Sequence, residues 1–354
     1  MRAFRFVVVI GLLAACEDGV RPTPVTSLPP VTPPPAAPQR PPAPPPAATP
    51  APPPAPAQDW IADARTGCRI YDPFVLGEHR VTWTGPCVSG RAEGNGVLTA
   101  VWQGSGEAHT DRHEGGMRAG KRHGRGVTIY ESASVNRRIE GTFRDGLLNG
   151  PVTSTSSDGS RFQGMMVDGR AEGRGSTRYA DGGTYEGEYR AGQRSGRGVQ
   201  TWPSGTRCEG SFSEDRLNGQ GSCRFDNGNL YVGGFANGQQ SGRGVLTFAN
   251  GGRYEGEWRN GKQHGQGVEN FPSGDRYAGS YVDGSATGRG SYQWANGNVY
   301  DGEYLNGRAH GQGSHRYFGE WASGWWENGC LYLPNGARRW VGPSSENASA
   351  CTRN

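Results

Sequence analysis

The sequence predicts an all-β fold built from repeated β-hairpins, and three observations lead to this prediction. The best copies of a short motif, Tyr185-Glu186-Gly187-Glu188-Tyr189 and Tyr254-Glu255-Gly256-Glu257-Trp258, alternate with the period of two of a strand that has one polar face. The composition, 60 glycines in 354 residues without long aliphatic runs, does not suit a thick core. The central glycine of the motif recurs with a period of 23 residues, as in an array of identical units: Gly141, Gly164, Gly187, Gly210, Gly233, Gly256, Gly279 and Gly302.

The N-terminal residues predict export and a lipid anchor. Arg2 and Arg5 precede an apolar run over residues 6–13 that is too short to span a bilayer, and Ala14-Ala15-Cys16 follows it. This arrangement resembles a bacterial lipoprotein signal with its lipobox, which implies cleavage after residue 15 and acylation of Cys16. The alternative is an ordinary secretory signal that happens to end in cysteine. The expected location is the bacterial cell envelope, facing the periplasm; Glu17, where an Asp would resemble an inner-membrane retention signal, favours the outer membrane.

Residues 16–58 are expected to form a disordered linker. Most of the 25 prolines lie here among Ala and Thr, which favours an extended polyproline conformation with no side chains to bury. At ~3.1 Å per residue, the segment reaches on the order of 100 Å from the membrane.

Six cysteines besides Cys16 fall into neighbouring pairs, and in an exported protein they are expected to form disulfides. Pairing in sequence order is one of the possible connectivities, and no spacing resembles a metal or redox motif. The predicted pairs are Cys68 with Cys87, Cys208 with Cys223, and Cys330 with Cys351.

Each unit is expected to be a hairpin whose rings lie over glycines. A register centred on Gly192-Gln193 places Tyr185 opposite Gln200, Gly187 opposite Gly198, and Tyr189 opposite Gly196. A flat ring can cross a position that has no Cβ, which gives the glycines a physical role. The same register places Cys208 opposite Cys223, close enough for a disulfide.

The odd period requires one connection per unit with an odd number of residues, because side chains alternate faces. The second connection is the expected place, since a three-residue bulged turn needs a glycine with positive φ. Its glycines are Gly182, Gly205, Gly228, Gly251, Gly274 and Gly297. In this arrangement Trp202, Phe225, Phe248, Phe271 and Trp294 face Cys208, Tyr231, Tyr254, Tyr277 and Tyr300.

The motif Tyr-x-Gly-x-aromatic, followed by Asn-Gly or Asp-Gly and then by Gly-x-Gly, resembles the MORN repeat (membrane occupation and recognition nexus). The resemblance covers about residues 80 to 325. It implies an elongated single-layer antiparallel sheet of stacked hairpins and divides the chain into a cap with a degenerate repeat (59–112), the array (113–316) and a C-terminal degenerate repeat with a disulfide cap (317–354). The family is linked to membrane association, oligomerisation and the organisation of protein complexes.

Catalysis is not expected. His123, His264 and His310 occupy one periodic slot and do not converge, and no glycine-rich element leads into a predicted helix. We therefore predict no enzyme, no cofactor and no metal. A net charge of +4 lacks the basic excess of a nucleic-acid-binding protein.

Two surfaces are candidates for binding. Arg174, Arg197, Arg243 and Arg289, with Arg125, recur between paired glycines on the face opposite the aromatic rings. They form either cross-strand ion pairs with glutamates such as Glu188 and Glu257 or a ladder for anions. The aromatic stripe is expected to stay partly exposed and to accept a partner. Its candidate residues are Tyr185, Tyr189, Trp202, Tyr254, Trp258 and Tyr300.

The predicted function is that of a non-enzymatic, lipid-anchored envelope scaffold that binds protein partners or itself. The alternative is direct binding of anionic lipid head groups or of an envelope polymer, peptidoglycan or another glycan, by the arginines and the aromatic groove.

Overall fold

The computed structural model describes residues 60–71, 79–104, 107–134, 136–317, 319–327, 329–332 and 338–340. All the regular elements in these residues are β-strands, so the predicted all-β fold is confirmed. The predicted signal peptide, Cys16, the proline-rich linker and Cys351 lie outside the described residues. In the described part of the chain, no helix is long and apolar enough to cross a membrane.

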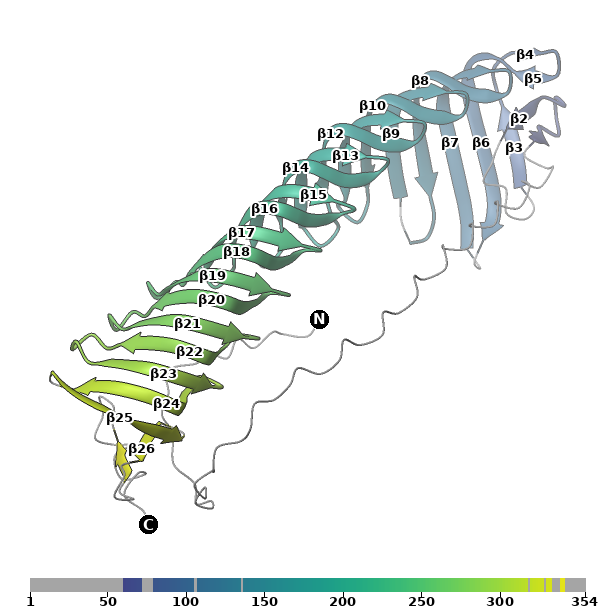
Figure 1. Cartoon of the computed structure of the whole chain (residues 1–354). Helices are drawn as coiled ribbons and strands as arrows, with labels where there is room; N and C mark the ends of the chain where they lie inside the picture. The colour runs from purple at the N-terminus through teal and green to yellow at the C-terminus, as the bar shows by residue number, and fades with distance from the viewer. Residues whose placement is uncertain are drawn as a thin grey trace, which may run out of the picture. The chain divides into compact units, whose positions relative to one another are not determined.

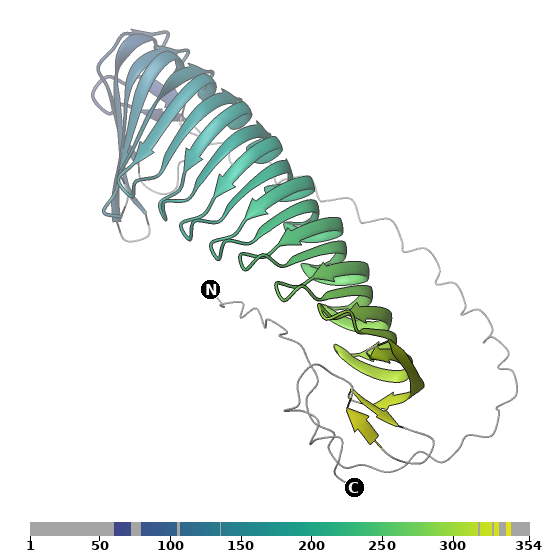
Figure 2. The same cartoon turned by 90° about the vertical axis from the view of Figure 1, so that its left-hand side faces the viewer.

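One antiparallel sheet in a single layer makes up most of this part (Figures 1 and 2). Its first strands are β3 (His79–Trp83), β6 (Gly94–Gly104), β7 (Glu107–Arg118), β8 (Lys121–Glu131), β9 (Asn136–Arg144), β10 (Leu147–Ser156), β11 (Arg161–Val167) and β12 (Arg170–Arg178). The regular repeats supply β13 (Thr184–Arg190), β14 (Gln193–Thr201), β15 (Arg207–Ser213), β16 (Arg216–Arg224), β17 (Leu230–Ala236), β18 (Gln239–Thr247), β19 (Arg253–Arg259), β20 (Lys262–Asn270), β21 (Arg276–Val282), β22 (Ser285–Gln293), β23 (Val299–Leu305) and β24 (Arg308–Tyr317). The last strands are β25 (Glu320–Glu327), β26 (Cys330–Tyr332) and β27 (Arg338–Trp340).

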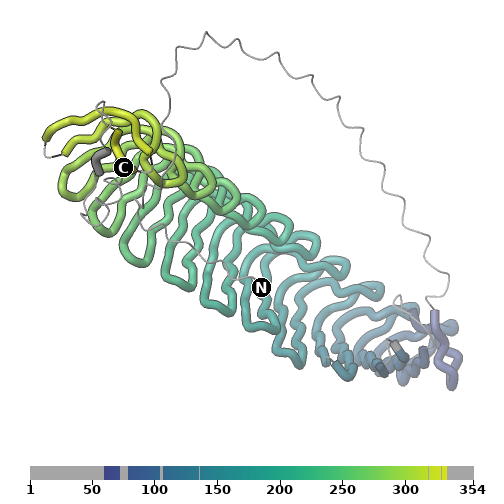
Figure 3. Tube along the Cα trace, turned by 90° about the horizontal axis from the view of Figure 1, so that it is seen from below, coloured from purple at the N-terminus to yellow at the C-terminus, as the bar shows by residue number. Residues whose placement is uncertain are grey.

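The sheet is open, and its strands follow chain order. Within the described residues β3 pairs only with β6 and β27 pairs only with β26, while each strand between them pairs with its two neighbours. The hairpins are curved and stack side by side along one axis (Figure 3). This is the single-layer array of hairpins that the sequence predicts.

The first turn of each repeat is a two-residue turn with positive φ at both positions, as in type I′ turns. In the hairpin of β13 and β14, Arg190 pairs with Gln193 across Ala191 (φ 51°) and Gly192 (φ 88°). Nearly all copies have glycine second, the position where it removes the steric cost of this conformation. The right-handed twist of the strands matches this turn, so it closes each hairpin without splaying it.

Away from this turn the register is as predicted, with Tyr185 opposite Gln200 and Gly187 opposite Gly198. Near the turn the prediction is wrong, because Tyr189 pairs with Arg194 and not with Gly196. A bulge at Gly196 and Arg197 shifts the register. Gly196 has φ 59°, and the Glu188 carboxylate occupies the space that a Cβ at Gly196 would need. The Arg197 N–H donates to Glu188 Oε1 (3.4 Å), so this glutamate stabilises the bulge.

The second turn is a three-residue connection, as predicted. The Trp202 N–H donates to the Thr206 carbonyl and the Gly205 N–H donates to the Trp202 carbonyl, both at 2.9 Å, with Gly205 at φ 96°. Because the ladder continues to Trp202 and Thr206, Cys208 pairs with Gln200 and not with Trp202. The residues that the sequence analysis predicted to face Cys208 and the tyrosines therefore lie two positions later in the chain than the residues that pair with them. Tyr231, Tyr254, Tyr277 and Tyr300 pair with Cys223, Leu246, Glu269 and Tyr292.

Hydrogen bonds between hairpin tips join successive repeats. The Gly192 N–H of one turn donates to the Ala171 carbonyl of the preceding hairpin (2.9 Å). The equivalent bonds run from Gly146 to Arg122, Gly169 to Leu148, Gly238 to Leu217, Gly261 to Gln240, Gly284 to Gln263 and Gly307 to Ala286. Since the tips are bonded along one edge, neighbouring hairpins are fixed in relative position.

A small second sheet closes the N-terminal end. It contains β1 (Trp60–Ala62), β2 (Arg69–Tyr71), β4 (Cys87–Val88) and β5 (Arg91–Ala92), in the order β1-β2-β5-β4. A disulfide joins Cys68 to Cys87, and the buried Asp63 carboxylate accepts the Trp83 N–H of β3 at 2.8 Å. Burial raises the pKa of Asp63, but hydrogen bonds from Trp83 and Arg65 outweigh this and lower it to about 2. The ionised Asp63 carboxylate thus accepts a hydrogen bond from a backbone N–H of β3, the first strand of the large sheet.

The central disulfide lies on the aromatic side of the sheet. Cys208 and Cys223 are directly opposite each other on β15 and β16, are bonded, and are buried at 4% and 3% exposure. The bond takes the place that a tyrosine has in the neighbouring units. Cys330 is buried, and its predicted partner Cys351 lies outside the described residues.

Candidate functional site

The aromatic face is defined by Tyr185, Gly187 and Tyr189 and their equivalents. Its rings pack against one another and bury this face. Tyr185, Tyr254 and Tyr300 are 0%, 0% and 2% exposed. Each ring meets its neighbours edge to face, for example Tyr254 with Trp258 and with Tyr281, at centroid distances of 5.2 and 5.1 Å. These contacts continue from repeat to repeat, so the rings form one zigzag core.

Most tyrosine hydroxyls on this face are also satisfied by hydrogen bonds within the sheet. Tyr185 donates to the Glu188 carbonyl and Tyr254 to the Glu257 carbonyl, both at 3.0 Å. Burial raises the pKa of Tyr185 to about 12, and it raises the pKa of Tyr254 as well. A buried and hydrogen-bonded phenol has a structural role in the core.

These observations correct the expectation of an open aromatic groove. Tyr185, Tyr189, Tyr254, Trp258 and Tyr300 are all buried. The physical reason is close backbone approach: a Cβ on Gly187 would lie 2.6 Å from the Gly198 Cα, so only glycine pairs let the ring cover the strands. Trp202 differs, since it lies at the start of a second turn and is 41% exposed.

The opposite side, called the polar face here, carries Glu186, Glu188, Arg197 and their equivalents. Arg174, Arg197, Arg243 and Arg289 are exposed, and no ion pair involves them in the described part of the chain. Arg174 and Arg243 lie opposite Glu188 and Glu257 in the register. The expected cross-strand ion pairs are nevertheless absent, because these glutamates bind the bulges of their own hairpins.

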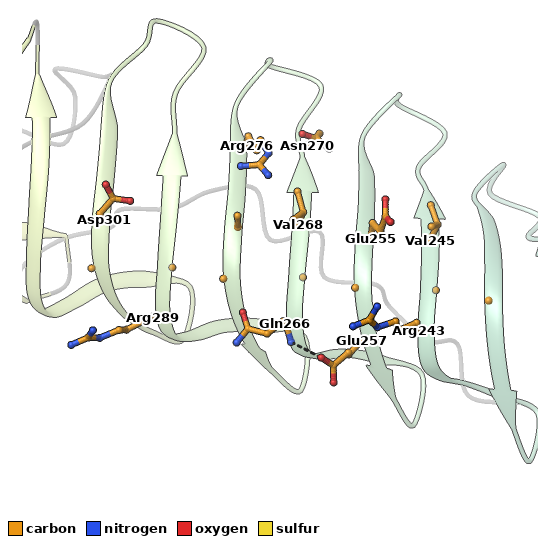
Figure 4. A pocket seen from close by; sticks show the side chains of 18 of the residues that line it. Arg243, Val245, Glu255, Glu257, Gln266, Val268, Asn270, Arg276, Arg289 and Asp301 are labelled. Atoms are coloured by element: carbon orange, nitrogen blue, oxygen red, sulfur yellow. Dashed lines mark hydrogen bonds between the residues drawn. The ribbon is translucent and has the colours of Figure 1, made fainter.

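A groove runs along the polar face from β16 to β25, with a volume of about 1410 Å³ (Figure 4). Glycines of the paired strands lie between two rows of side chains (Figure 4). One row contains Gln220, Arg243, Glu257, Gln266, Arg289 and Gln312. The other row contains Val232, Val245, Glu255, Val268, Ala278, Asp301, Ser314 and Ser323.

The row of Gln220 is continuous across the strands. Arg243 pairs with Glu257, and the Gln266 N–H donates to Glu257 Oε1 (3.3 Å). The Gln266 amide in turn donates to Ser280 Oγ (2.8 Å). Arginine and glutamine alternate in this row from one repeat to the next, so each kind of side chain returns every two units. The groove is therefore polar and periodic.

The sequence profile of the MORN repeat matches nine segments of the chain, which together make up more than half of it. They are residues 113–135, 140–161, 162–184, 185–207, 208–230, 231–253, 254–276, 277–299 and 300–318. The chain belongs to the MORN repeat family. Most of these units start at the residue that lies over the glycine pair, which is Tyr185 in one unit and His113 in the first.

Comparison with other proteins adds little to this assignment. No match was found among curated proteins. The MORN chain is similar to the SAS-4 (dCPAP) TCP domain in complex with a proline-rich motif of Ana2 (dSTIL) of Drosophila melanogaster, at 12% identity over 53% of this chain and 87% of that chain, with a TM-score of 0.27. A streptogramin B lyase structure is 8% identical over 73% of this chain and 93% of that chain, with a TM-score of 0.14. Likenesses this weak carry no argument about fold or function.

The three periodic histidines do not converge on one site in the described residues of the MORN chain. His264 and His123 lie beside Asp283 and Asp145 at hairpin tips, at 3.9 and 3.6 Å, and His310 pairs with Glu303. Each histidine is therefore in its own hairpin, as the periodic spacing predicts. The described residues contain no group of three or more His, Cys, Asp or Glu side chains that could hold a metal ion.

Sequence reasoning missed an apolar patch on the polar face, formed by Leu147, Pro151, Met165 and Val167. Pro151 pairs with Met165 on β10 and β11, and Leu147 reaches to 3.8 Å from the Cβ position of Gly169. Leu147, Met165 and Val167 are 42%, 45% and 46% exposed. The signal was available: these residues occupy positions that carry polar side chains in most other MORN units.

Two exposed tryptophans at the C-terminal end were also missed. Trp321 and Trp325 lie on the polar face of β25, at 57% and 44% exposure. Trp325 pairs with Gln312, the last side chain of the alternating row, and Trp321 pairs with Arg316. Only the register of β25 places them on this face, and the degenerate sequence of the last unit did not reveal that register.

Proposed function

We propose that this MORN protein is a non-enzymatic, lipid-anchored scaffold of the bacterial cell envelope that binds a protein partner through the apolar patch on its polar face. The proposed lipid anchor and location rest on the resemblance of residues 2–16 to a bacterial lipoprotein signal. The observation that carries the binding role is the patch itself. On the described polar face, it is where two adjacent strands together expose three large non-aromatic apolar side chains, each more than 40% exposed.

The surroundings of the patch favour a protein over a membrane. Arg170 and Arg174 lie beside it and form no ion pair in the described part of the chain, whereas Asp168 accepts hydrogen bonds from Arg144 and Asn149. The carboxylates of Asp168 and Glu172 beside these arginines give the patch a rim of mixed charge. A protein with a small apolar centre and a mixed, mainly acidic rim fits these charges.

The test is site-specific photo-crosslinking in intact cells, with the crosslinker at residue 167. Leu305 is the matched control, because it occupies the same repeat position six units later and is 45% exposed. We expect a defined adduct from position 167 and none from position 305, and we expect Met165→Asp, at a second exposed residue of the patch, to reduce the adduct from position 167 at least tenfold. Light scattering on the full chain shows whether the partner is a second copy.

Equal crosslinking from both positions, or no adduct together with a monomer in solution, would overturn the scaffold role. A thermal unfolding curve of Met165→Asp that matches the unsubstituted chain shows that the variant is folded.

A second candidate function is direct binding of an envelope polymer. The favouring observation is the row of exposed arginines without ion pairs on the polar face. Three arginines line the groove (Arg243, Arg276 and Arg289), but so do three carboxylates (Glu255, Glu257 and Asp301). This balance favours an uncharged polymer over an anionic one.

A further inference from the structure

The C-terminal part of the polar face combines a long polar groove with an exposed aromatic platform. The groove ends at Gln312, Ser314 and Ser323. Trp325 is the residue opposite Gln312, and it continues the row of Arg243, Gln266 and Arg289 by one more position. Ser314 and Ser323, joined by a 2.8 Å hydrogen bond, continue the other row. The groove and the tryptophans are therefore one surface.

The direction of this groove limits what can bind there. It runs across the strands, and the backbone groups in its floor are paired within the sheet. An extended peptide would find no free main-chain donors or acceptors, which are the source of affinity when a peptide adds to a sheet edge. A ligand in the groove must be recognised through side chains alone.

The side chains of the groove suit a ligand rich in hydroxyl groups. Amides, guanidinium groups, carboxylates and hydroxyls alternate along it, and the charges of the lining residues balance. A polyanion would meet Glu255, Glu257 and Asp301 as well as the arginines. An uncharged polyol can use both signs, because hydroxyls donate to carboxylates and accept from guanidinium groups.

The spacing points to a polymer with a matching period. Two strands per repeat give a rise of about 10 Å, which is close to the length of one disaccharide in an extended β-linked glycan. Consecutive units of the glycan would then meet equivalent positions of consecutive MORN repeats, and weak contacts would add up along the chain.

We infer that the polar face from β18 to β25 binds an uncharged linear glycan, which lies along the groove and stacks one sugar ring on the exposed face of Trp325. Trp321, two residues beyond Ser323 on the same face, provides a further ring. This inference develops the second candidate function. The apolar patch lies on β10 and β11, outside the residues that line the groove, so the scaffold role and the glycan site can fail separately.

The experiment is calorimetric titration of the full chain with chito-oligosaccharides of increasing length. We expect affinity to rise with length until the oligosaccharide spans the groove and to change little with salt. Trp325→Ala is expected to lower the affinity roughly tenfold, and Trp325→Phe to restore part of it. The matched control is Trp202→Ala, a tryptophan of similar exposure (41%) that lies outside the groove.

Each other outcome would overturn the inference. Absence of binding, or binding that Trp325→Ala leaves unchanged, removes the glycan site. Binding of dextran sulfate alone, with a steep loss at higher salt, identifies a polyanion site. Displacement of the oligosaccharide by a peptide of residues 29–57 identifies the proline-rich segment as the occupant. Met165→Asp should leave the titration unchanged, which separates this result from the test of the scaffold role.

Discussion

The first MORN units and the last ones solve the same packing problem with different rings. In the unit that starts at Tyr254, the tyrosine covers the glycine pair and its hydroxyl donates to a backbone carbonyl. In the unit that starts at His113, an imidazole takes this place, with Nδ1 3.0 Å from Thr128 Oγ1 and no hydrogen-bond partner for Nε2 in the described part of the chain. The core beside His113 also contains aliphatic residues such as Leu98 and Met117.

The difference shows which part of the motif the fold requires. The backbone geometry of the glycine pair is retained in both regions, with Gly115 opposite Gly126 and Gly256 opposite Gly267. The ring above it varies between tyrosine, phenylalanine and histidine. A flat side chain over two residues without Cβ atoms recurs in these units, whereas the Cys208–Cys223 disulfide takes its place in one unit. Where the ring has a polar atom, that atom decides how the region responds to pH and to substitution.

The largest difference is expected from one substitution made at equivalent positions of two units, those that start at Phe162 and at Tyr254. At Gly267, a new Cβ would lie 2.5 to 2.6 Å from the buried Tyr254 ring, whereas at the equivalent Gly175 the nearest atoms lie at 3.2 Å. We expect Gly267→Ala to cost about 3 kcal/mol and Gly175→Ala to stay within about 1 kcal/mol. Denaturant unfolding combined with regional hydrogen exchange measures both, and equal losses would contradict the close approach of ring and strand.

A second difference is expected in acid. Burial and the nearby Arg122 charge lower the pKa of His113 to about 4, compared with 6.5 for an unperturbed histidine. The unfolded chain therefore binds an extra proton between these values, so stability is complete above pH 6.5 and falls as the pH decreases to 4. The loss is about 1.4 kcal/mol per pH unit, or roughly 3 kcal/mol in total.

Regional hydrogen exchange tests this expectation in β7 and β8. Protection there should decrease from pH 7 to pH 4 after correction for intrinsic exchange, while β19 and β20 around Tyr254 keep theirs. His113→Tyr should abolish the decrease. If His113→Tyr loses protection as the native chain does, the titrating group is a different one.

The smallest effect concerns the hairpin tips. Ala191 adopts φ 51°, a conformation that asparagine tolerates better than alanine, and the C-terminal units have asparagine or aspartate there, as at Asn260. Ala191→Asn should stabilise the chain by roughly 1 kcal/mol and Asn260→Ala should destabilise it by a similar amount. Thermal unfolding measures both, and shifts of the same sign would contradict this account of the turn.

The sequence predicted the repeat, the all-β fold and the opposite faces of the repeated aromatic and arginine side chains, because these depend on local alternation and on periodic glycines. It also placed Cys208 opposite Cys223. It missed the bulge at Gly196 and Arg197, since a Gly-x-Gly segment fits a regular strand as well as a bulged one. The choice depends on the Glu188 carboxylate, which meets the bulge only after the hairpin has closed.

The candidate site was harder to predict for the same reason. The sequence placed the arginines on the polar face, but their missing ion pairs result from the use of Glu188 and Glu257 at the bulges. The burial of Tyr185 and Tyr254 results from curvature that accumulates over many glycine pairs, which no single unit displays. Trp325 was overlooked because its position depends on pairing at the end of the array.

One consequence of the two connections in each unit concerns the reach of the molecule. Across a two-residue tip, the positions on the aromatic face change from odd to even numbers or the reverse, whereas a three-residue turn leaves them unchanged. Because one such change occurs in each unit of 23 residues, which is an odd number, equivalent residues of successive units lie on the same face. Duplication or loss of one such segment therefore leaves all later side chains on their original side and changes the span by about 10 Å. Gain or loss of repeats in the gene can therefore change the length of the protein in equal steps without any change to the sequence of either end.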